Sequence, residues 1–345
     1  MKRAKKDIQI FVTGGTGFVG SYLLRTLVAD GYTKIRALRR SNSRMDLVQT
    51  IVDEVEWVEG DVLDIPFLED AMKGVQQVYH CAAMISFDSR KFSQMRKVNI
   101  EGTANVVNAA LYEGVEKFVH VSSIAAIGRA KSGMQITEKT KWERSKNNSQ
   151  YSISKYQAEQ EVWRGRAEGL RVAIVNPSVI MGAGFWSDGP LQFFKLVWNK
   201  FPFYTLGTTG VVDVRDVARF MVVLMESEVE GERFILNSSS VTYQEIMTII
   251  AKNMDRRPPY WRVTPVIQGL SWRLEWLKSR LFGGQAFITK ETARMTAQSY
   301  FYDNQKSCEQ FNFEYIPVEK TLAESAHLFQ QAVEKEFQPM LLPIT

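Results

Sequence analysis

The segment Thr13-Gly14-Gly15-Thr16-Gly17-Phe18-Val19-Gly20 decides the fold of this chain. The apolar run 8–12 before it is typical of a buried strand, and residues 22–28 after it place apolar side chains at helical spacing. A strand, a glycine turn and a helix in this order suit a dinucleotide pyrophosphate. Glycines let the backbone approach the phosphates, and the helix N-terminus supplies free N–H groups. The alternative is a tight turn that uses glycine for backbone reasons alone.

The charge of the chain is close to balanced outside its N-terminus. The 345 residues include 43 lysines and arginines against 38 acidic residues, a net charge of +5. Four of the basic residues, Lys2, Arg3, Lys5 and Lys6, stand together at the start. The rest of the chain lacks the clustered cations that a nucleic-acid surface needs, so we expect no nucleic-acid partner.

Cysteine and histidine usage favours a reducing compartment and no metal centre. Cys81 and Cys308 offer no disulfide framework, and His80, His120 and His327 lack metal-ligand spacing. No apolar run has the length of a membrane span, and the first one is too short for a signal peptide. We therefore predict a cytoplasmic protein without a metal and without stable membrane insertion.

Apolar runs and helical patterns alternate through the first half of the chain. This alternation predicts an α/β fold with a parallel, doubly wound sheet of the Rossmann type, whose site lies at the carboxyl ends of the strands. The expected strands after the first are residues 34–38, 55–62, 75–79, 118–123 and 171–175. The expected helices near the site are residues 99–111 and 151–168.

The alternation ends near residue 179. Residues 211–226 are interpreted as a strand and a helix that return to the sheet, and 233–236 as a further strand. We expect a Rossmann domain of residues 1–178 and 207–237, and a smaller, mostly helical substrate lobe of residues 179–206 and 238–345. The basic amphipathic segment 272–278 is expected to be a packed lobe helix, with a membrane-surface helix as the alternative.

Two arginines follow the second expected strand. A site for NAD(H) would place an acidic residue about 20 positions beyond the glycines to bind the ribose 2′-hydroxyl. Here Arg39, Arg40 and Ser41 occupy that neighbourhood, and the first acid is Asp46. A guanidinium group binds a 2′-phosphate well, so we predict NADP(H), with Arg40 ahead of Arg39 as its ligand. The alternatives are NAD(H), or arginines that only cover a sheet edge.

Polar and small residues end the third and fourth strands. Asp61 stands where a carboxylate could accept a hydrogen bond from an adenine amino group, although a turn or helix cap is an equal use for it. Ala82 and Ala83 are small enough for the backbone to pass beside the pyrophosphate and ribose. The loop 84–90 that follows is predicted to face the substrate.

Ser123, Tyr151 and Lys155 suggest a reaction. Tyr151 and Lys155 are four residues apart, so both lie on one helix face, and Ser123 ends the fifth strand. The lysine ammonium, together with the positive nicotinamide ring when the cofactor is oxidised, should favour the phenolate and lower the pKa of tyrosine from its ordinary value of about 10. The phenol could then protonate a carbonyl oxygen that Ser123 also holds. Asn99 is a poor interior helix residue, which suggests a task for its side chain.

Eight motifs resemble those of the extended short-chain dehydrogenase/reductase family, also called the NAD-dependent epimerase/dehydratase family. The resemblance covers nearly the whole chain. The motifs are TGGTGFVG (13–20), GDV (60–62), HCAA (80–83), VN (98–99), VSS (121–123), YSISK (151–155), NP (176–177) and VRDVA (214–218).

The resemblance implies the roles of individual residues. The acid/base would be Tyr151, assisted by Ser123, Lys155 and Asn99, and Lys155 would also bind the nicotinamide ribose. Asp61 and Val62 would contact adenine, and residues 177–179 the nicotinamide carboxamide. The full set of expected cofactor-binding residues is Gly14, Thr16, Gly17, Phe18, Val19, Gly20, Arg39, Arg40, Ser41, Asp61, Val62, Cys81, Ala82, Ala83, Tyr151, Lys155, Pro177 and Val179.

Within the family the chain resembles the dihydroflavonol reductase and 3β-hydroxysteroid dehydrogenase-like branch. Residues 35–40 are similar to the strand whose last arginine takes the NADP phosphate in the plant reductases. Sugar-nucleotide dehydratases carry Asp-Glu after the catalytic hydroxyl, where this chain has Ile124-Ala125. Sugar-nucleotide epimerases usually carry Arg-Asp where it has Thr209-Gly210. The many aromatic residues of 185–204 suit an apolar substrate, unless they are the core of the lobe.

These observations predict an NADP(H)-dependent oxidoreductase that reduces a ketone or aldehyde. The enzymatic alternative is a nucleotide-sugar epimerase or dehydratase, and the other is a non-catalytic regulator that senses NADP(H). The expected partner is a small carbonyl compound. Helices 99–111 and 151–168 match those that often pair into a four-helix bundle in the family, which predicts a homodimer.

Overall fold

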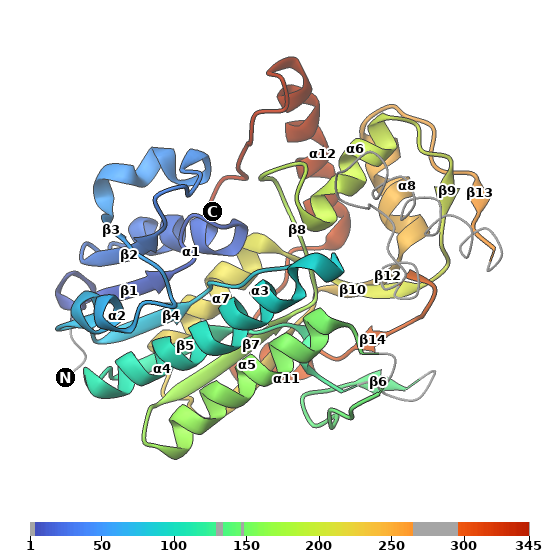
Figure 1. Ribbon diagram of the computed structural model, residues 1–345. Coiled ribbons are helices and arrows are strands. Elements are labelled where there is room, and N and C mark those ends of the chain that lie inside the picture. Colours follow the sequence, from blue (N-terminus) through green and yellow to red (C-terminus); the bar gives the residue numbers. More distant parts are fainter. Residues whose placement is uncertain (1–3, 129–133, 146–147, 265–295, 345) are drawn as a thin grey trace.

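The computed structural model describes residues 4–128, 134–145, 148–264 and 296–344 and is built around a seven-stranded parallel sheet (Figure 1). The strands are β1 (Ile10–Thr13), β2 (Ile35–Arg39), β3 (Glu56–Glu59), β4 (Gln77–His80), β5 (Lys117–Val121), β7 (Val172–Pro177) and β11 (Glu232–Leu236). They lie in the order β11-β7-β5-β4-β1-β2-β3, and every neighbouring pair is parallel. The predicted Rossmann-type sheet is confirmed.

The order of the strands indicates where a ligand of this sheet is expected to bind. The chain runs outward from β1 to β2 and β3, returns to β4 on the other side of β1, and continues through β5, β7 and β11. Strands β1 and β4 therefore flank the point at which the winding direction changes. Thr13 and His80, their last residues, are directly opposite each other. Ligands of such sheets bind beyond the carboxyl ends of the strands at this point.

Helices cover both faces of the sheet (Figure 1). On one face α1 (Phe18–Ala29) and α7 (Val214–Glu226) pack against Ile10 and Val12 of β1. On the other face α2 (Ile65–Met72), α4 (Gly102–Tyr112) and α5 (Gln150–Ala167) pack against Phe11. Burial on both faces explains why the strands are continuous apolar runs rather than alternating ones.

The helix predicted for residues 99–111 is longer than expected and irregular. It begins with α3 (Phe92–Arg96), passes through a π-helical segment at Lys97–Glu101 and continues as α4. Asn99 lies within the π-helical turn and is buried. Such turns are rare and frequent at functional sites, because they displace one side chain from the regular helical position.

The strand expected to return to the sheet in residues 211–226 does not do so. Strand β10 (Thr208–Asp213) lies between β8 (Val179–Met181) and β12 (Ser239–Thr242) in a separate three-stranded sheet. Of the strand and helix expected within residues 211–226, only the helix, α7, packs against the large sheet. Two short pairs, β6 (Gln135–Ile136) with β14 (Phe301–Tyr302) and β9 (Phe203–Tyr204) with β13 (Trp261–Arg262), complete the strands of the described residues.

Aromatic side chains of the predicted C-terminal lobe pack together and join the core on the α1 and α7 face of the large sheet. The helices of the lobe are α6 (Gln192–Trp198), α8 (Tyr243–Asn253), α11 (Gln305–Phe311) and α12 (Val318–Glu334). Trp186, Phe194 and Phe329 are buried together, with ring centroids 5.1–6.0 Å apart. Trp186 and Phe194 are therefore core residues of the predicted lobe, which was the alternative to contact with an apolar substrate. Segment 272–278 lies outside the described residues, and none of the described helices is long and apolar enough to cross a bilayer.

Two histidines lie buried side by side under the site. His80 of β4 and His120 of β5 stack with ring centroids 5.2 Å apart. His80 is bonded to the hydroxyls of Thr13 (2.7 Å) and Thr103 (3.0 Å), whereas neither ring nitrogen of His120 has a partner in the described part of the chain. Burial lowers the pKa of His80 to about 3 and that of His120 well below its ordinary value. Both imidazoles are therefore neutral in the folded protein.

We expect this pair to make the protein acid-sensitive. Below pH 6.5, the ordinary pKa of histidine, the unfolded chain binds protons that the folded chain excludes, so the free energy of unfolding falls as pH falls toward 3. Each group contributes at most about 1.4 kcal/mol per pH unit. Urea unfolding at several pH values should show a shallower dependence in His120→Leu. The exposed His327, changed to Gln, is the control, and an equal pH dependence in both variants would contradict this assignment.

Candidate active site

In the glycine turn after β1, an added Cβ would clash with backbone atoms at Gly14 and Gly20 but has space at Gly17. Gly14 has a φ of +71°, which glycine adopts without strain, and a Cβ there would lie 2.6 Å from the nitrogen of Ala82. A Cβ at Gly20 would lie 2.1 Å from the carbonyl oxygen of Gly14. Gly17, the N-cap residue of α1, is exposed, and its added Cβ would come no nearer than 3.2 Å to that oxygen. The turn therefore fits a pyrophosphate at Gly17.

The other expected residues of this turn offer mainly their backbone. Phe18 and Val19 form the first turn of α1, and Thr16 is half-buried just before it. The Phe18 ring meets Tyr22 edge-on at 5.8 Å, so this side chain is used in packing. The N–H groups at the start of a helix have no intrahelical acceptor, which leaves them for an anionic group.

The segment after β4 lies against the glycine turn. The N–H of Ala82 donates to the Thr13 hydroxyl at 3.3 Å, and Ala83 is exposed. Burial raises the pKa of the Cys81 thiol to about 12, so Cys81 is a small packing residue rather than a reactive thiol. The small side chains predicted to let the backbone pass beside the cofactor are thus next to Gly14.

Arg39 and Arg40 differ in their surroundings. The Arg39 guanidinium lies 3.3 Å from the Glu59 carboxylate on the neighbouring strand. The Arg40 side chain is exposed and makes no hydrogen bond or ion pair within the described residues, and its backbone N–H donates to the Ser43 hydroxyl. Ser41 is exposed beside it. Of the two guanidinium groups, that of Arg40 is available to a ligand.

Asp61 takes the turn role that was the alternative to adenine binding. Its Oδ1 accepts from the N–H of Leu63 at 3.0 Å, while Asp64 caps α2. The Val62 side chain is buried, and a Cβ on Gly102 would meet it at 2.7 Å. An adenine contact at these positions stays a prediction.

Ser123 and Tyr151 meet at the end of β5. Helix α5 starts at Ser149, whose hydroxyl accepts from the N–H of Ser152, and Tyr151 stands in its first turn. The Ser123 hydroxyl accepts from the N–H of Ala125 at 3.1 Å and lies near enough to the Tyr151 phenol to lower its pKa. The ring of Phe87, from the loop after β4, packs edge-on against Tyr151 at 6.0 Å. The fold thus brings together a phenol and a hydroxyl that lie 28 residues apart in sequence.

The electrostatics of Tyr151 differ from the expectation. Burial raises the pKa of the Tyr151 phenol, and the nearby Ser123 hydroxyl opposes that rise in part. The Lys155 ammonium is buried and donates to the carbonyl oxygen of Val121 at 2.8 Å. The lowered tyrosine pKa expected from Lys155 is therefore wrong for the protein without a bound cofactor, because desolvation dominates. Tyr151 is protonated at neutral pH.

The buried Asn99 side chain connects two segments next to Tyr151. Its amide accepts from the N–H of Met84 at 2.7 Å and donates to the Met84 carbonyl at 3.0 Å and to the Ser154 hydroxyl at 3.0 Å. The side chain thereby ties the loop 84–90 to α5. This explains the irregular helix, because the π-helical turn directs Asn99 inward.

Pro177 lies in the strand next to β5, and Val179 lies just beyond it in the three-stranded sheet. Pro177 ends β7 and is buried, and Val179 begins β8 and is half-buried. Their side chains are apolar, and a contact with the nicotinamide carboxamide stays a prediction. Among the described residues, no group of His, Cys, Asp or Glu side chains could hold a metal ion.

Four residues of the site were not assigned a role from the sequence. They are Phe87, Ser122, Glu159 and Asn176. Glu159 follows Tyr151 and Lys155 at the same spacing of four, so the helical period could have revealed it. Phe87 could not have been assigned, because its contact with Tyr151 depends on how the loop folds back.

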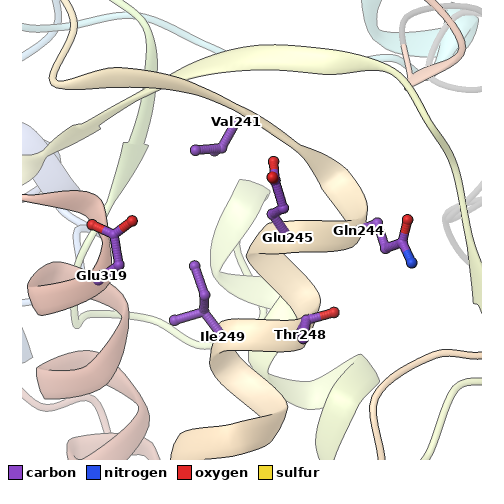
Figure 2. Close-up of a pocket in the computed structure, with 6 residues that line it drawn as sticks. All are labelled: Val241, Gln244, Glu245, Thr248, Ile249 and Glu319. Atoms are coloured by element: carbon purple, nitrogen blue, oxygen red, sulfur yellow. The ribbon is translucent and has the colours of Figure 1, made fainter.

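A hollow in the C-terminal lobe lies apart from these residues. Figure 2 shows it between β12, α8 and α12, lined by Val241, Gln244, Glu245, Thr248, Ile249 and Glu319. Glu245 is already engaged, since its carboxylate accepts from the N–H of Thr242 in a capping box. The hollow contains none of the predicted catalytic or cofactor-binding residues.

Known proteins share both the sequence pattern and this fold. A protein of Synechocystis sp. named "Putative dihydroflavonol 4-reductase" is 30% identical over 93% of this chain and 94% of its own length. A cinnamoyl-CoA reductase 1 of Petunia hybrida is 26% identical over 72% of this chain and 78% of its own. The crystal structure of gox2253 has 30% identity and a TM-score of 0.79, covering 94% and 98% of the two chains.

A more distant structure shows the same fold. DesIV, a dTDP-glucose 4,6-dehydratase of Streptomyces venezuelae, has 20% identity and a TM-score of 0.77, covering 95% of this chain and 98% of its own. The model of the NAD dependent epimerase/dehydratase family matches residues 10–237, which is more than half of the chain. The resemblance seen in the motifs is thereby confirmed, and the chain belongs to the NAD dependent epimerase/dehydratase family.

Proposed function

We propose that this protein is an NADP(H)-dependent reductase of ketones or aldehydes. The observation that carries the proposal is that the fold brings the Tyr151 phenol near the Ser123 hydroxyl, with Lys155 one helical turn away, at the carboxyl ends of the parallel strands. A phenol held protonated by burial is a proton donor, which is what carbonyl reduction needs. Relatives named as reductases of carbonyl compounds support the same class of reaction.

The chain's own residues would bind, hold and protonate the substrate. When bound, the nicotinamide supplies a hydride to the carbonyl carbon and is oxidised. The Tyr151 hydroxyl gives its proton to the carbonyl oxygen, so that C=O becomes CH–OH. Ser123 donates a hydrogen bond to the same oxygen as negative charge develops there. Lys155, charged beside the resulting phenolate, stabilises it until a proton returns.

The substrate is proposed to have an apolar or aromatic body. The loop 84–90 beside Tyr151 brings the Phe87 ring to the phenol and leaves Ile85 62% exposed. An exposed apolar side chain next to an acid/base suits an apolar substrate better than a diphosphate. Two relatives are named as reductases of compounds with an apolar or aromatic part, a cinnamoyl thioester and a farnesyl dihydroquinoline oxide.

A carbonyl panel tests the proposal. The protein is incubated with NADPH or NADH and dihydroflavonols, aromatic aldehydes, cinnamoyl thioesters and nucleotide sugars. We expect net oxidation of NADPH with at least one apolar carbonyl compound. Conversion of a nucleotide sugar without net NADPH consumption would show an epimerase or dehydratase instead. Tight NADPH binding with no turnover of any compound would indicate a regulator that senses NADP(H).

We expect Arg40→Ala to weaken NADPH binding selectively. Loss of a charge-assisted hydrogen bond to the 2′-phosphate should reduce the free energy of binding by about 1.5–3 kcal/mol, or roughly 10- to 100-fold in affinity. NADH, which lacks this phosphate, should bind unchanged. Calorimetric titration with both cofactors measures the difference. Arg39→Ala is the matched control, because Arg39 is paired with Glu59. Equal losses for NADPH and NADH would exclude Arg40 as the phosphate ligand.

A homodimer and a cytoplasmic location remain part of the proposal. The dimer would form through α4 and α5, which lie side by side on one face of the sheet (Figure 1). Tyr112 at the end of α4 is 74% exposed and is available to a second copy. A monomeric mass in solution would contradict the proposed homodimer.

A further inference from the structure

Glu159 is a fully buried carboxylate one helical turn beyond Lys155 on α5. A carboxylate without partners in the interior would be strongly destabilising, so its presence there requires hydrogen bonds and charge partners. The proposed reaction assigns it no role.

Four donors from four different elements surround this carboxylate. Its Oε2 accepts from the Ser122 hydroxyl at 2.6 Å and from the Asn176 amide at 2.9 Å. Its Oε1 accepts from the Arg233 guanidinium at 2.9 Å and from the Trp163 indole at 3.3 Å. The donors come from the end of β5, from β7, from β11 and from α5 itself.

These bonds act on the backbone that carries the catalytic serine. The amide of Asn176, oriented by Glu159, also donates to the carbonyl oxygen of Ser123 at 3.0 Å. The Lys155 ammonium donates to the carbonyl oxygen of Val121. Each of the three consecutive residues 121–123 is therefore held by a hydrogen bond. Val121 and Ser123 are held at their carbonyl oxygens, and Ser122 is held at its hydroxyl. One face of α5 supplies Tyr151, Lys155 and Glu159 to this segment.

We propose that Glu159 is a positioning residue for proton transfer at Tyr151: it fixes residues 121–123 through Ser122 and Asn176, and it provides the negative charge that keeps the buried Lys155 ammonium charged. The proton-transfer part rests on the proposed function. The effect on Lys155 is a property of the protein alone.

The charges around Lys155 support this assignment. Burial lowers the pKa of Lys155 to about 8, and Glu159 is the larger of the two influences that oppose the fall, Cys81 being the other. His80 and His120, which face Lys155 from β4 and β5, are neutral for the reasons given above. Arg233 faces Glu159 from β11 but is partly exposed to solvent, which weakens its effect on Lys155.

The test follows the titration of Lys155 directly. The protein is labelled with carbon-13 lysine, the Lys155 resonance is assigned with Lys155→Met, and the signal is followed from neutral to alkaline pH. In Glu159→Gln we expect the midpoint to fall by about one pH unit, a tenfold change in acidity. Glu161→Gln, which removes an outward-facing carboxylate of the same helix, should leave the midpoint unchanged. An unchanged midpoint in Glu159→Gln would overturn the proposal.

A second variant covers the case in which Glu159→Gln does not fold. Replacing both members of the ion pair, in Glu159→Gln with Arg233→Gln, removes the carboxylate together with the guanidinium that pairs with it. The Lys155 midpoint should fall in this protein as well, and an unchanged midpoint would again overturn the proposal. Where turnover is found, the alkaline limb of kcat should move with the midpoint. A shifted Lys155 midpoint in a protein without turnover would leave the effect of Glu159 on Lys155 standing, and would reject the proposed function together with the proton-transfer part of this inference.

Discussion

Tyr151→Phe is expected to lower kcat for carbonyl reduction by about 100- to 10,000-fold, the range that loss of a positioned general acid produces. The variant loses only the phenol hydroxyl that lies near Ser123. The ring that packs against Phe87 is retained, so no cavity forms. NADPH affinity and thermal stability should therefore change little. Single-turnover kinetics with saturating NADPH separates this loss from any effect on binding.

Tyr156→Phe is the matched control for this prediction. Tyr156 lies on the same helix and stacks on Trp142 with ring centroids 4.1 Å apart, a contact that phenylalanine preserves. Its kcat should equal that of the unmodified protein. If Tyr151→Phe keeps its turnover, Tyr151 is not the proton donor, and the acid must be sought elsewhere along the carboxyl ends of the strands.

The raised pKa of Tyr151 bears on the direction of the reaction. A phenol with a pKa above its ordinary value stays protonated across neutral pH, as the donor in reduction must. Oxidation of an alcohol would need the phenolate, which burial disfavours. In the protein without cofactor, Tyr151 therefore carries the proton that the proposed reduction uses.

The sequence predicted those parts of the molecule that depend on local pattern. The strand, glycine turn and helix around Gly17 follow from residue order, and the choice of Ser123 over Ser122 followed from the family motif. In the structure the Ser122 hydroxyl donates to Glu159, and the Ser123 hydroxyl lies near Tyr151. The catalytic role of Ser123 stays a prediction.

The features that were missed depend on partners far away in sequence. Strand β10 was expected in the large sheet, but an apolar strand carries no information about which neighbour it pairs with, and β8 and β12 bind it instead. Burial of Glu159 requires Asn176 and Arg233, which lie 17 and 74 residues away. In the protein without cofactor the pKa of Tyr151 is raised rather than lowered, because desolvation depends on packing that residue spacing does not show.

Gly20→Ala and Gly17→Ala should separate folding from cofactor binding. At Gly20 the new Cβ would lie 2.1 Å from the carbonyl oxygen and 2.8 Å from the carbonyl carbon of Gly14. Both atoms belong to the turn itself, so the clash can be relieved only if β1 and α1 move apart. We expect the free energy of unfolding to fall by about 3 kcal/mol or more, as in severe overpacking. Chemical denaturation without cofactor measures this change.

Gly17→Ala should have the opposite profile. Its backbone has φ −81° and ψ 175°, which alanine adopts readily, and its Cβ would meet only the Gly14 carbonyl oxygen, at 3.2 Å. Glycine and alanine differ as N-cap residues by about 1 kcal/mol or less, so the fold should persist. The methyl group would instead occupy the space through which a pyrophosphate approaches the helix N-terminus, and NADPH affinity should fall at least about tenfold. Unchanged NADPH binding in a stable Gly17→Ala protein would place the phosphates away from this turn.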